Sequence, residues 1–331
     1  MNRNIFNFMN LENFLQNLIN YQKKDPKGVL SAFFDYELLQ LYKTVTEEYL
    51  NEVGNKRKIV AKLKGLDVIG KNNKLIKHWV DLNYYFDHTY VLNLDRRQDR
   101  LKHSAGNLRK LGWFNWSRFR ALDGSDPNGK EKKEWEEYEK NQPTSGWDEM
   151  KYGRKAIETS GSWGILKSMY LMIKDAQRRK LKRILVLQDD NLFHKRFMEK
   201  FLNLVQGNMR IPSNWKLLYL GATQYDWTKV LRREGANFYF PMGTADGAFA
   251  VGIDESVYQE ILDEICRFDA PVDSGALSTI QVRYGKQCIV LKPNLIIADI
   301  RDSDLREGRN LEEHGKKLGW DPKLYRLKWE K

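Results

Sequence analysis

Residues 181–193 read Leu-Lys-Arg-Ile-Leu-Val-Leu-Gln-Asp-Asp-Asn-Leu-Phe, a short apolar run that ends in acidic and amide side chains. The nearly all-apolar run 183–187 predicts a strand that is buried on both faces of a sheet. In open α/β sheets, ligands bind at the carboxyl ends of the strands, and Asp189 and Asp190 lie at such an end. The stretch therefore indicates an α/β fold with a ligand site beside these two aspartates.

Two adjacent carboxylates repel each other, so another group has to compensate their charge. A divalent cation that bridges Asp189 and Asp190 to a diphosphate would do this, because Mn²⁺ and Mg²⁺ favour carboxylate, water and phosphate oxygens. The alternative is a solvated loop in which Asp190 or Asn191 caps the helix that follows. The pair alone leaves both interpretations open.

The residues that precede this strand predict the first units of an α/β sheet. A strand over 89–94 is followed by a helix that ends at Gly112, and a second strand over 117–122 follows. Residues 125–160 are polar and charged, which indicates an irregular insertion over the site. Ser160 or Ser162 is expected to cap the helix that leads into the central strand.

The residues that follow the central strand predict further helices and strands. A helix is expected from Phe193 to Val205, and Asp254 is expected to cap another. The expected strands cover residues 215–220, 237–240, 248–253, 287–291 and 295–297. Two turn-rich stretches each contain one acid, Asp246 and Asp273.

The length of 331 residues, of which 41% are hydrophobic, suffices for more than one domain. Apolar residues recur at helical spacing within 1–84, so we expect a helical N-terminal region of unknown role, which could mediate homo-oligomerisation, before a domain over 85–331. With only two cysteines, Cys266 and Cys288, no disulfide framework is implied. No apolar run long enough to span a bilayer and no signal peptide is recognised, so a cytoplasmic protein is expected.

The net charge of +12 and the isoelectric point of about 9.4 are compatible with nucleic acid, an anionic membrane or a phosphorylated substrate as the partner. The basic residues are interleaved with acids, as in residues 129–134, and no nucleic-acid-binding motif is present. A solvated basic surface explains most of the lysines, and no nucleic-acid partner is expected.

Five stretches occur in a fixed order along the chain: 90–100, 118–124, 185–190, 243–249 and 271–273. Their combination resembles glycosyltransferase family 25, which includes bacterial lipooligosaccharide galactosyltransferases and procollagen galactosyltransferases. The resemblance covers roughly residues 87–305. It implies a GT-A-like, Rossmann-type fold, a UDP-sugar donor carrying galactose or glucose, inversion at the anomeric carbon, and Mn²⁺ or Mg²⁺ as cofactor.

The resemblance also implies roles for individual residues. Asp189 and Asp190 would hold the metal, which stabilises the UDP leaving group. Asp246 or Asp273 would take the proton of the acceptor hydroxyl, although either could instead form a turn or cap a helix. The donor pocket is expected to include Asn93, Asp95, Arg96, Arg97, Arg100, Asp123, Gly124 and Lys167. Arginines pair bidentately with phosphate, and the alternative for them is a solvated helix start.

Two positions depart from the family pattern. Gln188 stands where the family usually has Glu, and Lys167-Ser168 stands where it carries a Ser-His pair. These departures leave a catalytically silent scaffold with the same fold as one alternative to the transferase. A basic nucleic-acid-binding protein is the other alternative, and it rests on the isoelectric point and on aromatics among basic residues, such as Trp113, Trp116, Arg118 and Arg120. A glycan, a lipid-linked sugar and a protein all remain candidate acceptors.

Overall fold

The computed structural model describes residues 83, 85–111, 113, 115–142, 156–206, 211–304 and 308–326. The chain divides into two compact units, one of residues 1–85 and 106–115 and the other of residues 86–105 and 116–331. The helices expected within 1–82, and with them the expected oligomerisation element, lie outside the described residues. In the first unit, Asn115 Nδ2 donates a hydrogen bond to the Asn83 carbonyl at 2.7 Å.

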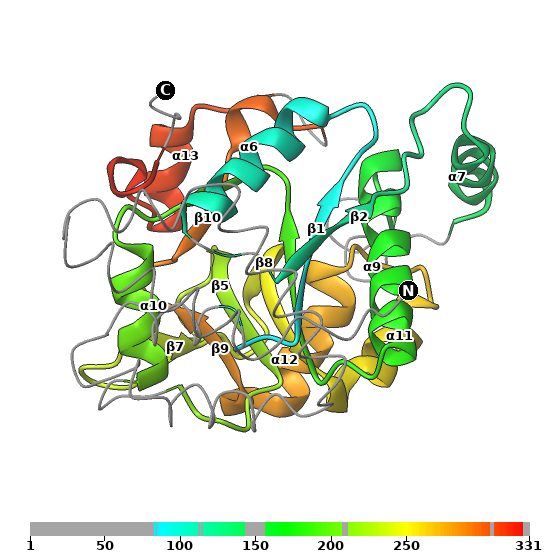
Figure 1. The fold of residues 1–331 in the computed structure, drawn as a ribbon. Helices are drawn as coiled ribbons and strands as arrows, with labels where there is room; N and C mark the ends of the chain where they lie inside the picture. Colours follow the sequence, from blue (N-terminus) through cyan, green and yellow to red (C-terminus); the bar gives the residue numbers. More distant parts are fainter. Residues whose placement is uncertain are drawn as a thin grey trace, which may run out of the picture. The chain divides into compact units, whose positions relative to one another are not determined.

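An eight-stranded mixed sheet forms the centre of the second unit (Figure 1). In order across the sheet, its strands are β2 (Trp116–Arg120), β1 (His88–Asn93), β3 (Arg183–Gln188), β8 (Ala245–Asp254), β5 (Leu217–Gln224), β9 (Cys288–Leu291), β7 (Phe238–Phe240) and β6 (Leu231–Arg232). Strands β2, β1 and β3 are parallel, whereas β8 runs antiparallel to both of its neighbours. The predicted α/β class is confirmed, with a sheet that is mixed.

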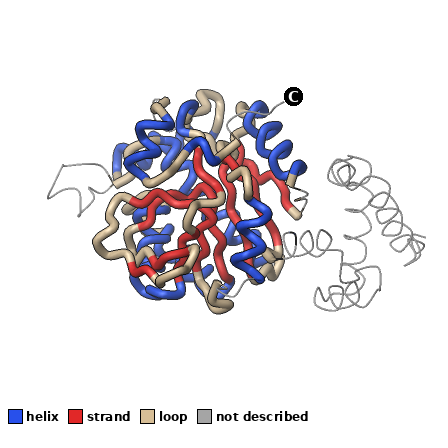
Figure 2. Tube along the Cα trace, turned by 90° about the vertical axis from the view of Figure 1, so that its left-hand side faces the viewer, coloured by secondary structure: helices blue, strands red, loops and turns tan. Residues whose placement is uncertain are grey.

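Helices surround the strands, as Figure 2 shows. The α-helices are α6 (Gln98–Lys110), α7 (Lys130–Asn141), α9 (Ser160–Arg178), α10 (Phe197–Gln206), α11 (Tyr258–Ile265), α12 (Ser278–Tyr284) and α13 (Leu311–Leu318). Short helical turns cover η2 (Glu255–Val257), η3 (Asp273–Leu277), η4 (Gly285–Gln287), η5 (Ile300–Asp302) and η6 (Pro322–Leu324). A second, two-stranded sheet pairs β4 (Asn191–Phe193) with β10 (Ile296–Ala298).

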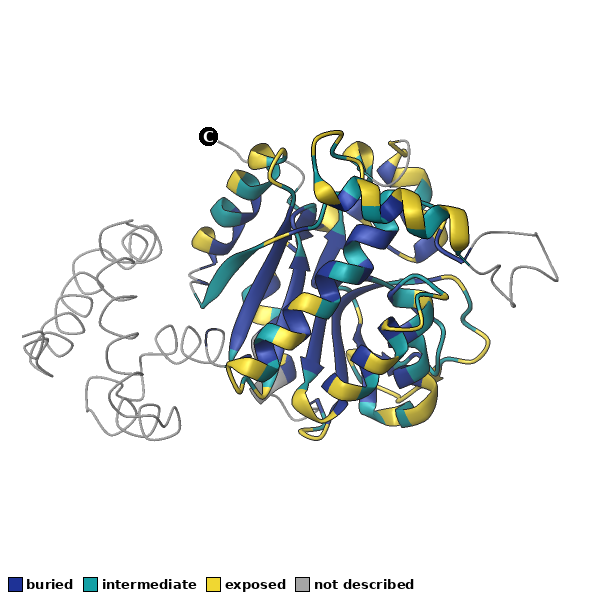
Figure 3. Cartoon of the chain, turned by 90° about the vertical axis from the view of Figure 1, so that its right-hand side faces the viewer, coloured by how far each residue is buried: buried dark blue, intermediate teal, exposed yellow. Residues whose placement is uncertain are grey.

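The central strand β3 is buried on both faces, as its sequence predicts. Residues 184–187 have no exposed surface, and Ile184 and Val186 pack into the same core cluster as Met169 and Ile173 of α9. Figure 3 shows the strands buried and the outer faces of the helices exposed. Because both faces of the strand are covered, the apolar run at 184–187 is continuous and does not alternate.

Part of the expected irregular insertion is a helix, α7, so that prediction was wrong for residues 130–141. Its Trp135 is buried and lies 6.2 Å from the ring of Trp163 on α9, measured between ring centroids. The Lys and Glu residues around Trp135 are good helix formers, and the single buried aromatic anchors the helix to the domain. The many charged residues of 130–141 therefore belong to a surface helix, although they suggested an irregular loop.

Two expected helix starts were also wrong. The helix expected from Phe193 begins at Phe197, because residues 191–193 form strand β4. Helix α9 is capped by Thr159, whose hydroxyl accepts the backbone N–H of Ser162 at 3.1 Å. The predicted cap at Asp254 is confirmed, since its carboxylate accepts the N–H of Ser256 at the start of η2.

Candidate functional site

The carboxyl ends of β1, β2 and β3 meet at one edge of the sheet. The parallel register pairs Asn93 with Arg120 and Leu92 with Gln188. The residues that follow each strand therefore lie close together, although they come from three separate parts of the chain.

A cavity of about 110 Å³ opens at this edge. It is lined by Leu92, Leu94, Arg96, Arg100, Ala121, Leu122, Asp123, Ser125, Ser160, Gly161, Ile165, Gln188, Asp189, Asp190, Ser303 and Asp304. A second cavity of about 210 Å³ is lined by Asp99, Arg100, His103, Asp189, Asp190, Asp299 and Asp302. Arg100, Asp189 and Asp190 border both cavities, so they lie at the centre of the candidate site.

Asp189 is held in place by three side chains. Asn93 Nδ2 donates to its Oδ2 at 2.6 Å, and Arg100 Nη1 approaches its Oδ1 at 3.3 Å. Ser104 Oγ donates to the Asp189 carbonyl at 2.9 Å. Burial raises the pKa of the Asp189 carboxyl, while Asn93 and Arg100 lower it. Asn93 and Arg100, both predicted for the donor pocket, thus contact Asp189 directly.

Asp190 lacks comparable partners. Its Oδ1 is buried and accepts no hydrogen bond from the described part of the chain. Burial raises the pKa of the Asp190 carboxyl to about 7, Arg100 opposes this rise, and the charge of Asp189 adds to it. An unpaired buried carboxylate is unfavourable, so this oxygen is suited to a cation or a proton.

The helix-cap alternative for Asp190 and Asn191 does not match the structure. The residues after Asp190 form strand β4, and Asn191 is fully buried. Its Nδ2 donates to the Gln188 carbonyl at 2.6 Å and to Ser104 Oγ at 3.0 Å. Asn191 therefore shapes the turn that presents the two aspartates.

No metal centre is complete within the described ranges, since no three His, Cys, Asp or Glu side chains there are arranged as ligands of one ion. Asp189 already accepts hydrogen bonds from Asn93 and Arg100, which occupy part of its coordinating capacity. A cation at Asp189 and Asp190 would need further oxygen ligands from water or from a phosphate.

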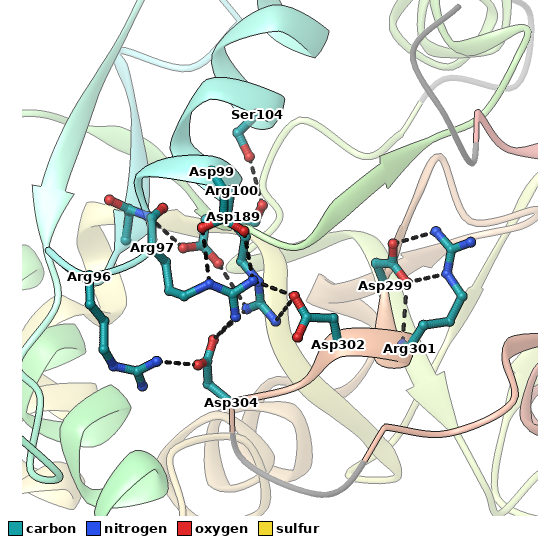
Figure 4. Close-up of polar contacts among 11 residues, drawn as sticks. Arg96, Arg97, Asp99, Arg100, Ser104, Asp189, Asp299, Arg301, Asp302 and Asp304 are labelled. Atoms are coloured by element: carbon teal, nitrogen blue, oxygen red, sulfur yellow. Dashed lines mark hydrogen bonds and ion pairs between the residues drawn. The ribbon is translucent and has the colours of Figure 1, made fainter.

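Three arginines at the start of α6 form what we call the arginine cluster: Arg96, Arg97 and Arg100 (Figure 4). All three contact Asp304, through Arg96 Nη1 at 2.5 Å, Arg97 Nη1 at 2.7 Å and Arg100 Nη1 at 3.0 Å. Arg97 also pairs with Asp302 and with Asp99, and Arg100 Nη2 lies 3.8 Å from Asp302. The carboxylates of Asp302 and Asp304 thus contact the arginines that were expected to bind the phosphates of the donor.

Asp123 joins the arginine cluster from the loop after β2. Its Oδ2 accepts from Arg96 Nε at 2.8 Å, and its Oδ1 accepts the N–H of Ser125 at 3.0 Å. Burial raises the pKa of the Asp123 carboxyl, but hydrogen bonds from Ser125 and Arg96 outweigh it, so the pKa is lowered overall. Asp123 is therefore an ionised residue that lines the first cavity.

Asp95 does not line either cavity. Its carboxylate pairs with Arg118 Nη2 at 2.5 Å and with Arg120 Nε at 2.7 Å, both on β2. Hydrogen bonds from Arg118 and Arg120 lower the pKa of the Asp95 carboxyl. Arg118 also donates to Asn93 Oδ1 at 2.8 Å. The ion pair of Asp95 with Arg118 therefore helps to position Asn93, which in turn orients Asp189.

Lys167 likewise lines neither cavity. Its ammonium group pairs with Glu134 of α7 and lies 4.6 Å from the centre of the Trp163 ring. The neighbouring Ser168 accepts the N–H of Leu122 at 2.9 Å, which fixes the loop after β2 against α9. The geometry places Ser168 in a supporting position and Lys167 at the contact between α7 and α9.

Gly124 provides space rather than a ligand contact. A Cβ atom there would lie 3.1 Å from the Ser160 carbonyl oxygen and 3.1 Å from the Trp163 ring. The loop after β2 can approach the start of α9 because residue 124 has no side chain.

Asp246 and Asp273 lie close to each other at the same edge of the sheet. β8 is antiparallel to β3, and Leu187 pairs with Ala250, so the first residues of β8 extend beyond the carboxyl end of β3. Asp273 Oδ2 accepts the N–H of Gly247 at 3.0 Å. Burial and the nearby Asp273 raise the pKa of Asp246 to about 7. Neither acid lines the two cavities described above.

The acidic side chains that reach the site from residues 299–304 were not predicted from the sequence. β10 pairs with β4, and the Asp299 N–H donates to the Asp190 carbonyl at 2.6 Å, so the chain after β10 returns to the two aspartates. Asp302, Ser303 and Asp304 follow at once. The available signal was the acid-rich run directly after the last predicted strand.

Residues 86–240 match the sequence model of glycosyltransferase family 25, described as LPS biosynthesis protein. Procollagen galactosyltransferase 2 of Mus musculus is 26% identical over 136 residues, which are 41% of this chain and 21% of that protein. The chain thus spans about a fifth of the length of this relative. The family resemblance is confirmed over residues 86–240, which contain Asn93, the arginine cluster, Asp189 and Asp190. No helix in the described segments has the length and apolar character needed to cross a bilayer.

Proposed function

We propose that this protein, whose residues 86–240 match the model of glycosyltransferase family 25, transfers a hexose from a UDP-sugar to an acceptor hydroxyl. The acceptor oxygen forms a bond to the anomeric carbon, the bond from that carbon to the β-phosphate oxygen breaks, and UDP leaves. The observation that carries the proposal is the cavity at the strand edge, where Arg96 and Arg100 lie beside Asp189 and Asp190. A GT-A-like fold is part of the proposal and is supported by the loops that follow three parallel strands.

A divalent cation, Mn²⁺ or Mg²⁺, suits the two aspartates. Both offer carboxylate oxygens, and Asp190 Oδ1 is buried without a hydrogen-bond partner among the described residues. Such an ion, when bound, supplies positive charge that stabilises the departing diphosphate. Asp189 and Asp190 would hold it, with Asn93 and Arg100 fixing the orientation of Asp189.

The arginines supply the remaining positive charge for the phosphate groups. Arg100 is 12% exposed, and its Nη2 donates no hydrogen bond within the described residues. That nitrogen and Arg96, which also lines the cavity, are placed to donate to phosphate oxygens. Arginine suits this role because its planar guanidinium makes two parallel hydrogen bonds.

Asp246 is our first candidate for the base, and Asp273 is the second. An inverting transfer needs a base that takes the acceptor proton on the side opposite the leaving group. The carboxylate of Asp246 accepts no hydrogen bond among the described residues, whereas Asp273 is engaged with the Gly247 N–H. A pKa of about 7 places Asp246 near the working pH of a typical base.

The test is binding of UDP to the full chain by isothermal titration calorimetry, with and without Mn²⁺, followed by transfer assays with UDP-galactose and UDP-glucose. We expect UDP to bind more tightly with Mn²⁺, and we expect Asp190→Asn to lose that dependence. An Asp263→Asn variant removes an exposed carboxylate from α11 and serves as the charge-matched control.

Two other results would lead to the alternative functions. Binding of UDP without transfer or hydrolysis of any UDP-hexose would indicate the catalytically silent scaffold. Absence of UDP binding, together with an affinity for RNA or DNA that falls steeply with salt, would indicate a nucleic-acid-binding protein.

A further inference from the structure

The arginine cluster is already occupied by carboxylates of the same chain. We call residues 299–304 the acidic segment; it contains Asp299, Asp302 and Asp304. Asp304 contacts all three arginines, at 2.5, 2.7 and 3.0 Å. Asp302 pairs with Arg97 and lies 3.8 Å from Arg100 Nη2. Figure 4 shows the guanidinium groups directed toward these two carboxylates.

The balance of charge around the cluster opposes the entry of another anion. Three guanidinium groups contact five carboxylates, those of Asp99, Asp123, Asp189, Asp302 and Asp304. A diphosphate brought into this arrangement would add negative charge to a region that already has an excess of it. Removal of Asp302 and Asp304 from the cluster would leave three guanidinium groups and three carboxylates.

The acidic segment reaches the site through backbone pairing that does not involve these side chains. The Asp299 N–H donates to the Asp190 carbonyl, and β10 pairs with β4. Backbone hydrogen bonds at Asp299 and Ile300 therefore anchor the segment, and the contacts of Asp302 and Asp304 with the cluster are ion pairs of their carboxylates. The side chain of Asp302 is 73% exposed, so its transfer to water costs little.

We propose that Asp302 and Asp304 are internal competitors of the donor diphosphate, which hold the arginine cluster in the donor-free protein and give way when the diphosphate binds. This inference rests on the proposed function for the identity of the ligand. Asp304 is the main competitor, because it contacts all three arginines and is only 17% exposed. The two acids thereby lower the apparent affinity for the donor. The apparent dissociation constant equals the intrinsic one divided by the fraction of molecules in which the arginine cluster is free of the two acids.

A purely structural role for Asp304 predicts the opposite result. If its carboxylate only positioned the arginines for the donor, its loss would leave them disordered and would weaken donor binding. Competition predicts tighter binding. The sign of the change in dissociation constant therefore separates the two roles.

The experiment measures the dissociation constants of UDP and of inorganic pyrophosphate, both with Mn²⁺, by calorimetry on the full chain. The proteins are the wild type, Asp302→Asn, Asp304→Asn, the double variant and Asp304→Glu, with Asp263→Asn as the charge-matched control. We expect the double variant to bind UDP roughly tenfold more tightly, since several partly exposed ion pairs no longer compete. Asp304→Glu, which keeps the charge, and Asp263→Asn should bind like the wild type.

Melting temperatures check that each variant is folded. Asp302→Asn changes a largely exposed side chain, so it provides the test even if substitution of Asp304 prevents folding. Asp302→Asn alone should bind UDP a few times more tightly, and unchanged or weaker binding by the folded variants overturns the competition. Pyrophosphate that binds more tightly to the variants while UDP binds to none supports the competition and overturns the UDP-sugar proposal. Binding of neither probe to any protein overturns both.

Discussion

Two pairs of aspartates lie at the same edge of the sheet, and their surroundings differ. In each pair one member has a raised pKa of about 7, Asp190 in the first and Asp246 in the second. The first pair, Asp189 and Asp190, lies beside the guanidinium of Arg100. The second pair, Asp246 and Asp273, has no cationic side chain among the causes of the shift at Asp246, and Asp273 accepts a backbone N–H.

The difference indicates a division of work. A carboxylate pair that lies beside a guanidinium group suits the binding of a metal ion and a diphosphate. Asp246 is a half-buried carboxylate whose pKa is raised by burial and by another acid, so it suits a proton, because both causes favour its neutral form. Substitutions in each pair should therefore have different effects on activity and stability.

The largest expected effect comes from the first pair. Asp190→Asn should lower the rate of transfer about a thousandfold, because removal of a group that stabilises charge in the transition state costs about 10²–10³ in rate. The measurement is kcat for UDP-hexose transfer at saturating Mn²⁺, with Asp263→Asn as the control. A rate within threefold of the wild type would mean that Asp190 has no part in the reaction.

A smaller loss of activity is expected from the second pair, with a different kinetic signature. Asp246→Asn should lower kcat about a hundredfold, at the lower end of the range for loss of a general base. The KM for the UDP-sugar should stay within about twofold of the wild type, because Asp246 does not line the candidate donor cavities. A raised KM with an unchanged kcat would instead place Asp246 in donor binding.

The pH profile sharpens the same assignment. A base must be deprotonated, so kcat should fall as the pH drops through about 7, where Asp246 takes up its proton. Asp273→Asn removes the neighbouring acid that contributes to the raised pKa of Asp246. The fall of kcat on the acidic side of the pH profile should therefore occur at a lower pH in this variant. An unshifted profile in that variant would show that the two acids are not coupled.

Asp190→Asn should raise the stability of the protein although it lowers the rate of transfer. Its pKa is raised in the folded protein, so the protonated form is favoured by folding, and the carboxyl destabilises the protein as the pH rises from about 4 to about 7. Asp190→Asn removes this cost, and without Mn²⁺ its melting temperature should exceed that of the wild type by about 2–4 °C at pH 8. The gain should be smaller at pH 5, and a melting temperature that falls at pH 8 would contradict the destabilising effect of the unpaired Asp190 Oδ1.

The sequence predicted those parts of the site that depend on local patterns. The apolar run 184–187 identified the central strand, because burial on both faces leaves a continuous apolar sequence. The family resemblance assigned Asn93, Arg96, Arg100 and Asp123 to one pocket. The strand pattern agrees, because these residues lie at or just after the carboxyl ends of two predicted strands, and parallel strands bring those ends to one edge.

The remainder depends on pairing that no local pattern reveals. The acidic segment reaches Asp190 only because β10 pairs with β4, a contact of three residues on each strand between parts of the chain about a hundred residues apart. Such short pairings have no periodicity of their own from which to predict a partner. Likewise, Lys167 was assigned to the donor pocket without knowledge of α7, which supplies Glu134 as its partner.

The smallest expected effect concerns Lys167. Because its ammonium group pairs with Glu134 and lies over Trp163, Lys167→Ala should leave the KM for the UDP-sugar within about twofold of the wild type. The loss of stability should be about 1 kcal/mol or less, since the pair and the ring contact are both partly exposed. Glu134→Gln should give a similar change in the free energy of unfolding, measured by urea denaturation. A large increase in KM for Lys167→Ala alone would return this lysine to the donor pocket and would show that the contact between α7 and α9 opens when the donor binds.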